Sequence, residues 1–589
     1  LMLNGRFCYT DGGFTLDPRG SDIMDNEFNG QQINAGNDWQ FIAVPRQYLG
    51  SMYHYLTDRN TINLSLDGNY FLEGFIGGDH EIRFGVDYYT GDTTTTTLFP
   101  NNRIAYTHLE SDPSYYQSLW LTPNTKLDVT FNRISFYLSD TAQFGKLSVN
   151  LGARYDKESG KINSTVNPAF TWYEPGSPFH GTNPFPTLLG EMNQVAGDSP
   201  MSYEVISPRL SLSYDITGDG KNVVKFTAAR YGSQSGNSLS TRYAYVNREV
   251  DVYWYDDGDF VPEYTEINWG VIAWTNTDRI DYSTGWRKCS VDPDFNSPLL
   301  DELSLSFEKA LGEDLAVSVS GFYKKRHNLT RAIGVMSSGQ LETEANNWYY
   351  AGDYTFLDGS TAPYYLRNEQ PGEFYYTNYD NDTYERYMAV VLQFSKKFSN
   401  KWMFDASFTY ADWKAFYKKE DYDCPGNGTG AGDLTNYDYY NEAVNAPAVS
   451  GSSGLSGIFV NARWQVKASG LYQLPWGINI TGVMQAREGY VLPYHESMYR
   501  SGIRWTNMYK LGEKFGDNRL PTFWMLSLGL EKTFKISETA TATLFVDGYN
   551  ITNNVTTLLV ETDYAADNFD QPLRILNPGI FQFGIRVSF

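Results

Sequence analysis

The sequence predicts an all-β fold: a transmembrane antiparallel β-barrel with long extracellular loops and short periplasmic turns. Three observations predict it. Many segments of about ten residues alternate apolar and polar side chains, so that each strand has one face for lipid and one for water. Phenylalanine, tryptophan and tyrosine make up 16% of the chain, which suits a barrel with aromatic girdles. The connections are alternately short and long, which is typical of outer-membrane barrels.

The last nine residues, FQFGIRVSF, show the alternation most clearly. Gln582, Gly584, Arg586 and Ser588 fall on one face. Because a terminal strand of this kind seals a barrel, we expect its apolar face to be the assembly signal that the barrel assembly machinery reads. That face consists of Phe581, Phe583, Ile585, Val587 and Phe589.

The chain begins less regularly. Residues 1–58 contain one possible strand, LMLNGRFCYT, followed by a stretch rich in Gly, Asp and Asn. We treat residues 1–58 as a poorly defined barrel start within a single barrel domain, residues 1–589. Regular alternation begins at residue 61 and continues in HEIRFGVDYY (80–89), where charged residues alternate with apolar ones. A strand face that carries charges must meet water, which a barrel lumen supplies.

The segment KLSVNLGARY (146–155) places Val149 on its apolar face. If that side chain meets lipid at mid-bilayer, arginine at this position should cost about 2–4 kcal/mol. Similar segments continue to the end of the chain, and we expect about sixteen to twenty-two strands, with 22 in a complete barrel. They are residues 207–216, 223–231, 302–311, 314–327, 386–398, 401–414, 461–477, 478–490, 523–534, 541–550 and 581–589.

The lengths of the connections predict short turns at one end of the barrel and long loops at the other. Short turns are expected at residues 216–222, 309–314, 396–402, 474–479 and 535–540, and long loops at residues 158–203, 235–300, 335–385, 415–458 and 491–521. A propeller or a sandwich would not sort its loops in this way. The run from Asp215 to Gly220 resembles the start of a calcium loop, but Phe226 stands where such a loop needs a glutamate. It is therefore predicted to be a hairpin turn.

Composition excludes several classes of function. The formal net charge of -23 argues against a nucleic-acid partner, and there is no apolar run of about twenty residues that would predict a membrane-spanning helix. The six histidines are scattered and no catalytic motif is present, so we predict no enzyme, no metal site and no cofactor. Cys8, Cys289 and Cys424 lack metal-ligand spacing. Cys289 and Cys424 can pair or remain free thiols.

The long loops interleave aromatic residues with Asn, Asp, Glu and Gln. Aromatic faces can stack on sugars or apolar groups while the polar side chains bind hydroxyls or backbone, which suits glycans or peptides. The alternative is that these aromatics build self-packed loops and interface girdles. The candidate ligand-binding residues are Trp172, Tyr173, Trp348, Tyr349, Tyr375, Tyr376, Tyr439 and Tyr440.

Three segments near the end of the chain resemble the closing strands of TonB-dependent outer-membrane receptors. They are RLPTFWMLSLGLEKTFKI (519–536), TATLFVDGYNITNN (541–554) and ILNPGIFQFGIRVSF (575–589). Three further segments, taken in order, are similar to the Oar-like branch of these receptors, and the resemblance covers about residues 60–589. These segments are ISPRLSLSYDITGDGKNVVKFTAARYG (206–232), LLDELSLSFEKALGEDLAVSVSGFYKKR (299–326) and GLYQLPWGINITGVMQAREGYVLPY (470–494).

The resemblance implies a 22-stranded barrel in the outer membrane of a Gram-negative bacterium, closed by a plug and energised through TonB. The implied function is uptake of a large glycan, peptide or chelate without covalent chemistry. The implied partners are the TonB complex acting through a plug, membrane lipid and lipopolysaccharide, and a surface lipoprotein or another outer-membrane protein. We see no plug, TonB box or regulatory domain in residues 1–589. The alternative is a structural or adhesive protein whose barrel anchors loops that bind other surface proteins.

Overall fold

The computed structural model describes most of the chain, with gaps mainly near the start and in the loops. The described residues are 1–16, 38–41, 47–49, 54–99, 103–108, 117–172, 174, 176–244, 247–255, 263–369, 371–416, 443–444, 458–500, 503–508, 516–564 and 566–589.

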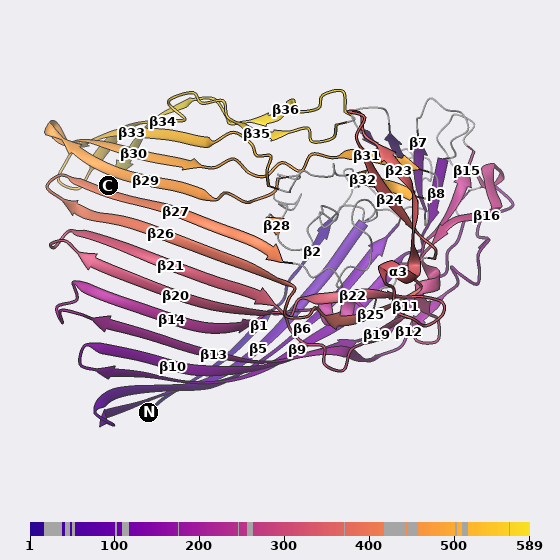
Figure 1. Cartoon of the computed structure of the whole chain (residues 1–589), viewed down its shortest axis with the longest axis horizontal. Helices are drawn as coiled ribbons and strands as arrows, with labels where there is room; N and C mark the ends of the chain where they lie inside the picture. Colours follow the sequence, from indigo (N-terminus) through magenta and orange to yellow (C-terminus); the bar gives the residue numbers. More distant parts are fainter. Residues whose placement is uncertain are drawn as a thin grey trace.

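One large antiparallel sheet forms the wall of the molecule (Figure 1). It contains eighteen strand segments, and, apart from the two short segments β2 and β28, each strand pairs with the wall strand that follows it along the chain. β2 continues the line of β1 along β5, and β28 continues the line of β29 along β27. The eighteen segments therefore form a wall that is sixteen strands wide. The strands are β1 (Met2–Thr10), β2 (Gly13–Leu16), β5 (His54–Phe75), β6 (Gly78–Leu98), β9 (Thr125–Phe144), β10 (Leu147–Ile162), β13 (Gly197–Asp215), β14 (Asn222–Gly232), β20 (Leu299–Ala310), β21 (Leu315–His327), β26 (Tyr384–Ser399), β27 (Trp402–Phe416), β28 (Ala443–Val444), β29 (Trp464–Leu474), β30 (Ile478–Arg487), β33 (Phe523–Lys535), β34 (Thr541–Tyr549) and β37 (Ile580–Ser588).

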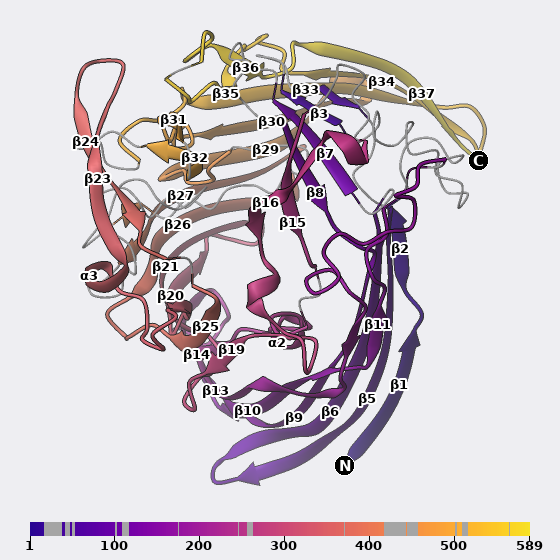
Figure 2. The same cartoon turned by 90° about the vertical axis from the view of Figure 1, so that its right-hand side faces the viewer.

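The wall curves around a central space, with β1 and β37 at its two edges (Figure 2). Within the described residues, β1 pairs with β5 and β37 pairs with β34, and the two edges do not pair with each other. The fold is therefore the predicted antiparallel barrel wall with an open seam. The predicted total of 22 strands in a complete barrel stays a prediction.

The poorly defined start contains more regular structure than its sequence suggests. β1 pairs with β5 from Met2 to Thr10 without a break, and β5 begins at His54, ahead of the alternation at residue 61. β5 is 22 residues long, about twice the length that a tilted strand needs to cross a bilayer. The wall therefore extends beyond the membrane on one side.

Short turns and long connections lie at opposite ends of the wall, as predicted. The turn between β13 and β14 illustrates the short type: the backbone amides of Gly218 and Gly220 donate to the Asp215 carboxylate, at 2.9 and 2.7 Å. Both glycines have a positive φ, of 81° and 72°, a conformation that glycine adopts without strain. The Asp215 carboxylate closes this hairpin turn through backbone hydrogen bonds.

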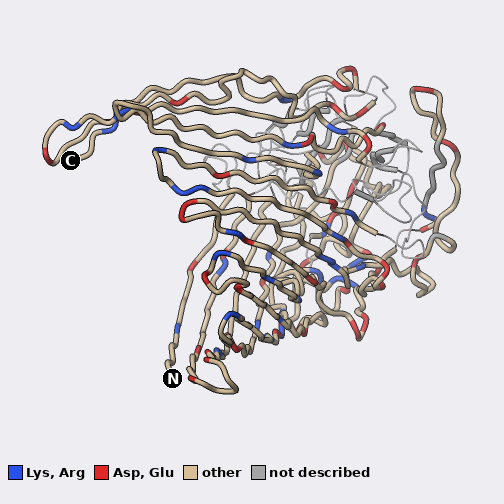
Figure 3. Tube along the Cα trace, turned by 60° about the vertical axis from the view of Figure 1, so that its left-hand side comes forward, with Lys and Arg blue, Asp and Glu red and all other residues tan. Residues whose placement is uncertain are grey.

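The two faces of the wall differ as the alternation requires. Leu66, Val86 and Phe136 are cross-strand neighbours on the outer face, and the side chains of Leu66 and Phe136 remain about half exposed. On the inner face the Tyr137 hydroxyl donates to Asp67 at 2.6 Å, and Arg6 pairs with the same carboxylate at 2.9 Å. Figure 3 shows charged residues along the strands as well as in the loops. The outer face thus suits lipid and the inner face water.

The terminal strand β37 matches its predicted pattern. Its apolar residues lie on the outer face and are largely exposed, from 54% for Val587 to 74% for Phe583, and Phe589, which follows the strand, is fully exposed. On the inner face the ring of Phe545 covers Gly584, where a side chain would collide with it. Whether the apolar face acts as an assembly signal stays a prediction.

The long connections fold into a second layer over one end of the lumen (Figure 2). Three of them contribute two strands each to a six-stranded sheet, so connections far apart in the sequence stabilise one another. Its strands are β3 (Asp38–Phe41), β4 (Gln47–Leu49), β7 (Arg103–His108), β8 (Gln117–Leu121), β15 (Val250–Trp254) and β16 (Ile267–Thr275).

The remaining elements are short and also belong to the long connections, except for one 3-10 turn in a short connection, Pro475–Gly477. They are the strands β11 (Thr165–Asn167), β12 (Met192–Gln194), β17 (Ile280–Asp281), β18 (Trp286–Arg287), β19 (Cys289–Val291), β22 (Thr330–Val335), β23 (Trp348–Thr355), β24 (Thr361–Arg367), β25 (Glu373–Asn378), β31 (Glu496–Arg500), β32 (Ile503–Met508), β35 (Thr557–Val560) and β36 (Pro572–Ile575), the helices α2 (Ser238–Thr241) and α3 (Glu344–Asn347), and the 3-10 turns Tyr264–Glu266 and Thr277–Arg279.

Candidate functional site

A cleft on the inner wall lies where the segment after β14 turns back into the lumen. Two cavities, of about 380 and 140 Å³, adjoin there, and Gln234 lines both of them. Their walls carry four arginines and several tyrosines from β5, β6, β9, β10, β13 and β14. We call this site the inner arginine cleft, defined by Arg59, Arg133, Arg154 and Arg209 together with Tyr89 and Tyr231.

Arg133 contributes a positive charge to this cleft and has no ion-pair partner among the described residues, although the carboxylates of Asp92 and Glu158 also line the two cavities. Glu158 faces it in the β9–β10 register, but the Glu158 carboxylate accepts hydrogen bonds from the backbone amide and the hydroxyl of Ser235, at 3.1 and 3.0 Å. The Arg133 guanidinium instead lies 5.5 Å from the centre of the Tyr89 ring. Among the described residues its Nε has no hydrogen-bond partner.

Arg209 and Arg154 differ in how their charges are compensated. Arg209 lies 4.9 Å from the centre of the Tyr231 ring, and no carboxylate in the described part of the chain pairs with it. Arg154 pairs with Asp156 at 2.8 Å and with Asp87 at 3.2 Å. The cleft therefore offers two guanidinium groups on aromatic rings to an anionic group of a ligand, since arginine binds planar anions through paired hydrogen bonds.

The loop layer above the cleft is held by a dense aromatic core. Trp172 is fully buried, and its ring packs edge-on against Tyr264 and Trp269 at 5.7 and 5.5 Å. Its indole nitrogen donates to Glu174 at 2.7 Å. The same core contains Leu119, Leu121, Phe170, Leu189, Val250, Val252, Trp254 and Ile267. Trp172 thus packs within the protein, and its ring offers no free face to a ligand in this structure.

The other predicted ligand-binding aromatics are divided among several places. Tyr376 in β25 is 3% exposed and belongs to a second core with Tyr203 and Phe295, while its neighbour Tyr375 is half-buried. Trp348 and Tyr349 lie on the β23–β24 hairpin, where Arg367 covers the Trp348 ring at 4.7 Å and Tyr349 is 46% exposed. Tyr173, Tyr439 and Tyr440 lie outside the described residues.

Sequence reasoning did not identify the inner arginine cleft. Its arginines lie on the polar faces of alternating strands, and that alternation was the available signal. Which arginine finds a carboxylate depends on the side-chain directions of neighbouring strands. The register alone would have paired Arg133 with Glu158, whereas the loop residue Ser235 binds that carboxylate.

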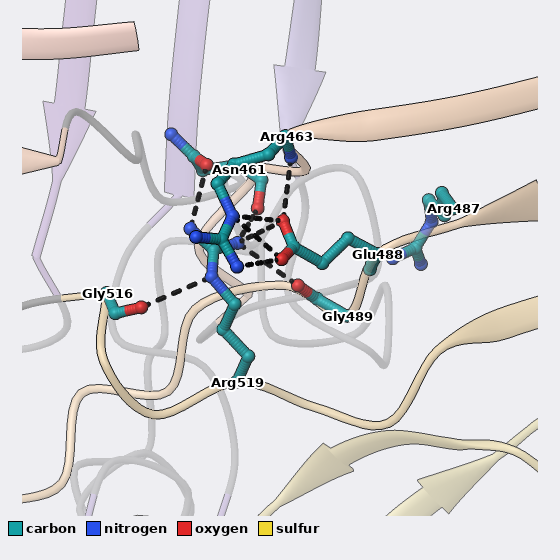
Figure 4. Close-up of polar contacts among 7 residues, drawn as sticks. All are labelled: Asn461, Arg463, Arg487, Glu488, Gly489, Gly516 and Arg519. Carbon is teal, nitrogen blue, oxygen red and sulfur yellow. Dashed lines mark hydrogen bonds and ion pairs between the residues drawn. The ribbon is translucent and has the colours of Figure 1, made fainter. Parts of the chain in front are cut away.

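A second polar cluster fastens the loop after β30 to the wall (Figure 4). Glu488 pairs with Arg463, which comes just before β29, and with Arg519 at 3.2 Å. Arg519 also donates to the carbonyl of Asn461 at 2.7 Å and to that of Gly489 at 3.2 Å. Burial raises the pKa of the Glu488 carboxyl, but hydrogen bonds from Arg463 and the charge of Arg519 outweigh it and hold that pKa below its usual range.

Cys289 is a free, half-buried thiol, and Cys424 lies outside the described residues. Burial raises the pKa of the Cys289 thiol to about 12, while nearby arginines act in the opposite direction. Because the thiolate is the reactive form, Cys289 should resist maleimide in the folded protein at pH 7 and react after unfolding. Cys8 is exposed and serves as the internal control. Labelling of Cys289 as fast as Cys8, measured by peptide mass spectrometry, would contradict this burial.

Among the described residues no helix is both long and apolar enough to cross a membrane. The same part of the chain contains no group of three or more His, Cys, Asp or Glu side chains arranged to hold a metal ion.

A family profile described as "Outer membrane beta barrel domain" matches residues 75–489, more than half of the chain. The chain belongs to the outer membrane beta barrel domain family. Membership assigns the short turns of the wall to the periplasmic side and the long loops to the extracellular side of a Gram-negative outer membrane. No curated protein matches this member of the family.

Solved structures resemble this family member in fold alone. The outer membrane transporter YddB from Escherichia coli is 13% identical with a TM-score of 0.46, and the match covers 94% of this chain and 58% of YddB. The ferric-catecholate import receptor Fiu from E. coli K12 is 10% identical, with a TM-score of 0.46 and coverages of 92% and 56%. The siderophore receptor PiuA from Acinetobacter baumannii is 10% identical with a TM-score of 0.45, and the match covers 92% of this chain and 57% of PiuA. The chain thus spans less than two thirds of the length of these proteins.

Proposed function

We propose that this chain is the barrel domain, residues 1–589, of a TonB-dependent receptor that takes up a large substrate with energy from the inner membrane. The observation that carries the proposal is a wall sixteen strands wide whose long extracellular loops fold over the lumen. Side chains can fill an eight-stranded barrel, but barrels of sixteen or more strands enclose a channel or a plugged lumen. The resemblance of residues 519–589 to the closing strands of such receptors supports the same function.

The inner arginine cleft supports a substrate that carries an anionic group. A ligand that passes the loop layer meets Arg133 and Arg209, which have no ion-pair partner among the described residues. Substrates with carboxylate, phosphate or metal-chelate anions fit this wall better than neutral ones. The proposed partners are the TonB complex, acting through a plug elsewhere in the protein, and a surface lipoprotein at the loops.

Uptake by cells that express the complete gene tests this function. Gene-dependent import of a glycan, peptide or ferric chelate should stop when a protonophore is added or TonB is deleted, since a passive pore needs neither. R133Q should reduce import of an anionic substrate by roughly tenfold. The matched control is K225Q, which removes an inner-wall cation already paired with Glu308 at 2.7 Å and should leave import unchanged. Import that survives TonB deletion would contradict the proposal.

One feature favours a second function, an anchor for contacts with other surface proteins. The β23–β24 hairpin lies at the edge of the loop layer (Figure 2), where Tyr354 and Leu357 donate to Glu496 at 2.8 and 2.9 Å. Tyr349, Tyr350 and Leu357 on this hairpin are 46%, 55% and 73% exposed. Exposed tyrosines are frequent anchors in protein interfaces. If cross-linking through this hairpin captures a surface protein and no substrate is imported, the adhesive function replaces the receptor function.

A further inference from the structure

A row of cations crosses the outer face of the wall at its extracellular end. The strand registers align Arg230 with Asp301, Asp301 with Lys325, Lys325 with Arg386, and Arg386 with Lys414. Four cations and one carboxylate from five adjacent strands thus form a single line. We call it the outer cation row, defined by Arg230, Lys325, Arg386 and Lys414. Its sign is opposite to the net charge of the chain, -23.

The depth of this row follows from the length of β26. Lys396 lies ten residues after Arg386 on the same strand and face. Ten residues of an extended strand span about 34 Å. When the strand is tilted by about 40° from the membrane normal, this length covers a height of about 25 Å, which is the height of the apolar band of an outer-membrane barrel. The two cations therefore mark the two boundaries of the band. Arg386, and Lys325 beside it, therefore lie at the extracellular boundary, where lipid headgroups are.

Directly below the row, toward mid-bilayer, the wall has an apolar hollow of about 500 Å³. Gly321 forms its floor, and a side chain built there would meet no atom within 4 Å. The lining includes Phe226, Leu305, Tyr323, Val390 and Tyr410. An acyl chain that entered this hollow would exchange lipid contacts for contacts with aromatic and branched side chains.

Within the row, the carboxylates leave positive charge in excess. Asp301 is held by Arg230 at 2.6 Å and by His327 at 3.1 Å. Asp412, one step below the row, lies 3.2 Å from Arg386 and 3.7 Å from Lys414.

Lys325 and Arg386 are the cations best placed to bind a ligand. The Lys325 ammonium lies over the Tyr384 ring at 4.2 Å and donates to a backbone carbonyl at 3.5 Å. The Arg386 guanidinium lies over the Phe416 ring at 4.8 Å, and its buried Nε lacks a hydrogen-bond partner among the described residues.

We propose that the outer cation row and the hollow beneath it bind a phosphorylated lipid of the outer leaflet. Its phosphate lies on Lys325 and Arg386, and one of its acyl chains fills the hollow over Gly321. Charge complementarity and depth together select this occupant. A free phosphate would leave the hollow empty, and a neutral lipid would leave the cations without an anion. The site faces lipid, so it is independent of the transport function proposed for the lumen.

Binding of defined lipids to the purified, delipidated protein in detergent tests this site by native mass spectrometry. The probes are diphosphoryl lipid A, the same lipid without phosphates, and inorganic phosphate. The wild type should bind the diphosphoryl form at least about tenfold more tightly than the dephosphorylated form. The double variant K325Q/R386Q should lose that preference, and K325R/R386K should keep it. The control K157Q neutralises an outer-face cation paired with Glu204 at 2.5 Å and should change nothing.

The hollow has a separate test. G321F fills it with an aromatic ring and should weaken binding of diphosphoryl lipid A while leaving the preference for phosphate intact. Folding of every variant is checked by its heat-dependent shift in gel mobility. Equal binding by the wild type and K325Q/R386Q would overturn the proposal. So would displacement of the lipid by inorganic phosphate at equal concentration, because that result would assign the cations to a small anion.

Discussion

Replacing Leu392 with arginine should lower the free energy of unfolding by about 2–4 kcal/mol, the cost of an arginine at the midplane of an outer-membrane barrel. Leu392 lies on the outer face of β26 and is 47% exposed. Its cross-strand neighbours Val319 and Phe408 are also apolar. It lies between Arg386 and Lys396, which mark the boundaries of the apolar band. Denaturant unfolding in lipid vesicles, followed by tryptophan fluorescence, measures the effect.

Two further arginine variants test whether the loss of stability depends on the face of the wall and on the depth of the residue in the bilayer. Gln393 is the next residue and points into the lumen, where Ser318 donates to it at 3.2 Å, so Gln393→Arg should change stability by about 0.5 kcal/mol or less. Val149 is the third residue of β10 and lies nearer the periplasmic boundary than mid-bilayer, so Val149→Arg should cost about 0–1 kcal/mol. An equal cost for Gln393→Arg and Leu392→Arg would show that the two faces are assigned wrongly.

Much of the wall could be predicted because the alternation of side chains and the short turns act locally. The predicted segment 223–231 lies within β14, and the predicted segment 302–311 nearly coincides with β20. The strand β9 was not predicted as a segment, although it pairs along its whole length with β6. Its pattern is blurred because Phe131 and Tyr137 point inward while Asp140 lies on the outer face. The alternation of apolar and polar residues therefore does not predict a strand whose lumen-facing side chains include aromatic rings.

The loops could not be predicted in the same way, because contacts between distant segments decide which aromatics are exposed. Trp172 and Tyr349 lie in similar aromatic stretches of the sequence. Trp172 is fully buried because it packs in one core with residues from two distant segments, namely Leu119, Leu121, Val250, Val252, Trp254 and Ile267. Tyr349 lies on the β23–β24 hairpin at the edge of the loop layer and remains exposed. Composition identifies such stretches as loops, but only their packing separates a core residue from a contact surface.

The Glu488 cluster gives the second large prediction. Glu488→Gln should destabilise the packing of the loop after β30 by about 3 kcal/mol, since removing one partner of a buried ion pair leaves the other charge uncompensated. The side chains of Glu488 and Arg519 are 12% and 10% exposed. Hydrogen exchange at Leu492 and Leu520 measures the loss, because their amides bond to Asn518 and Tyr490 across the loop. The exposed pair Lys157–Glu204 is the control, and Lys157→Gln should cost less than about 1 kcal/mol.

The same cluster should make the loop sensitive to acid. The pKa of Glu488 is lower in the folded protein than in the unfolded chain. Its contribution to stability is therefore complete above the unfolded pKa of about 4.3 and is lost as the pH falls through the lower, folded value. Exchange at Leu492 and Leu520 should accelerate in the wild type as the pH falls below about 4, after correction for the intrinsic rate. In Glu488→Gln the corrected rate should already be fast at pH 7 and should change little with acid. An acid response that persists in Glu488→Gln would assign the sensitivity to another carboxylate.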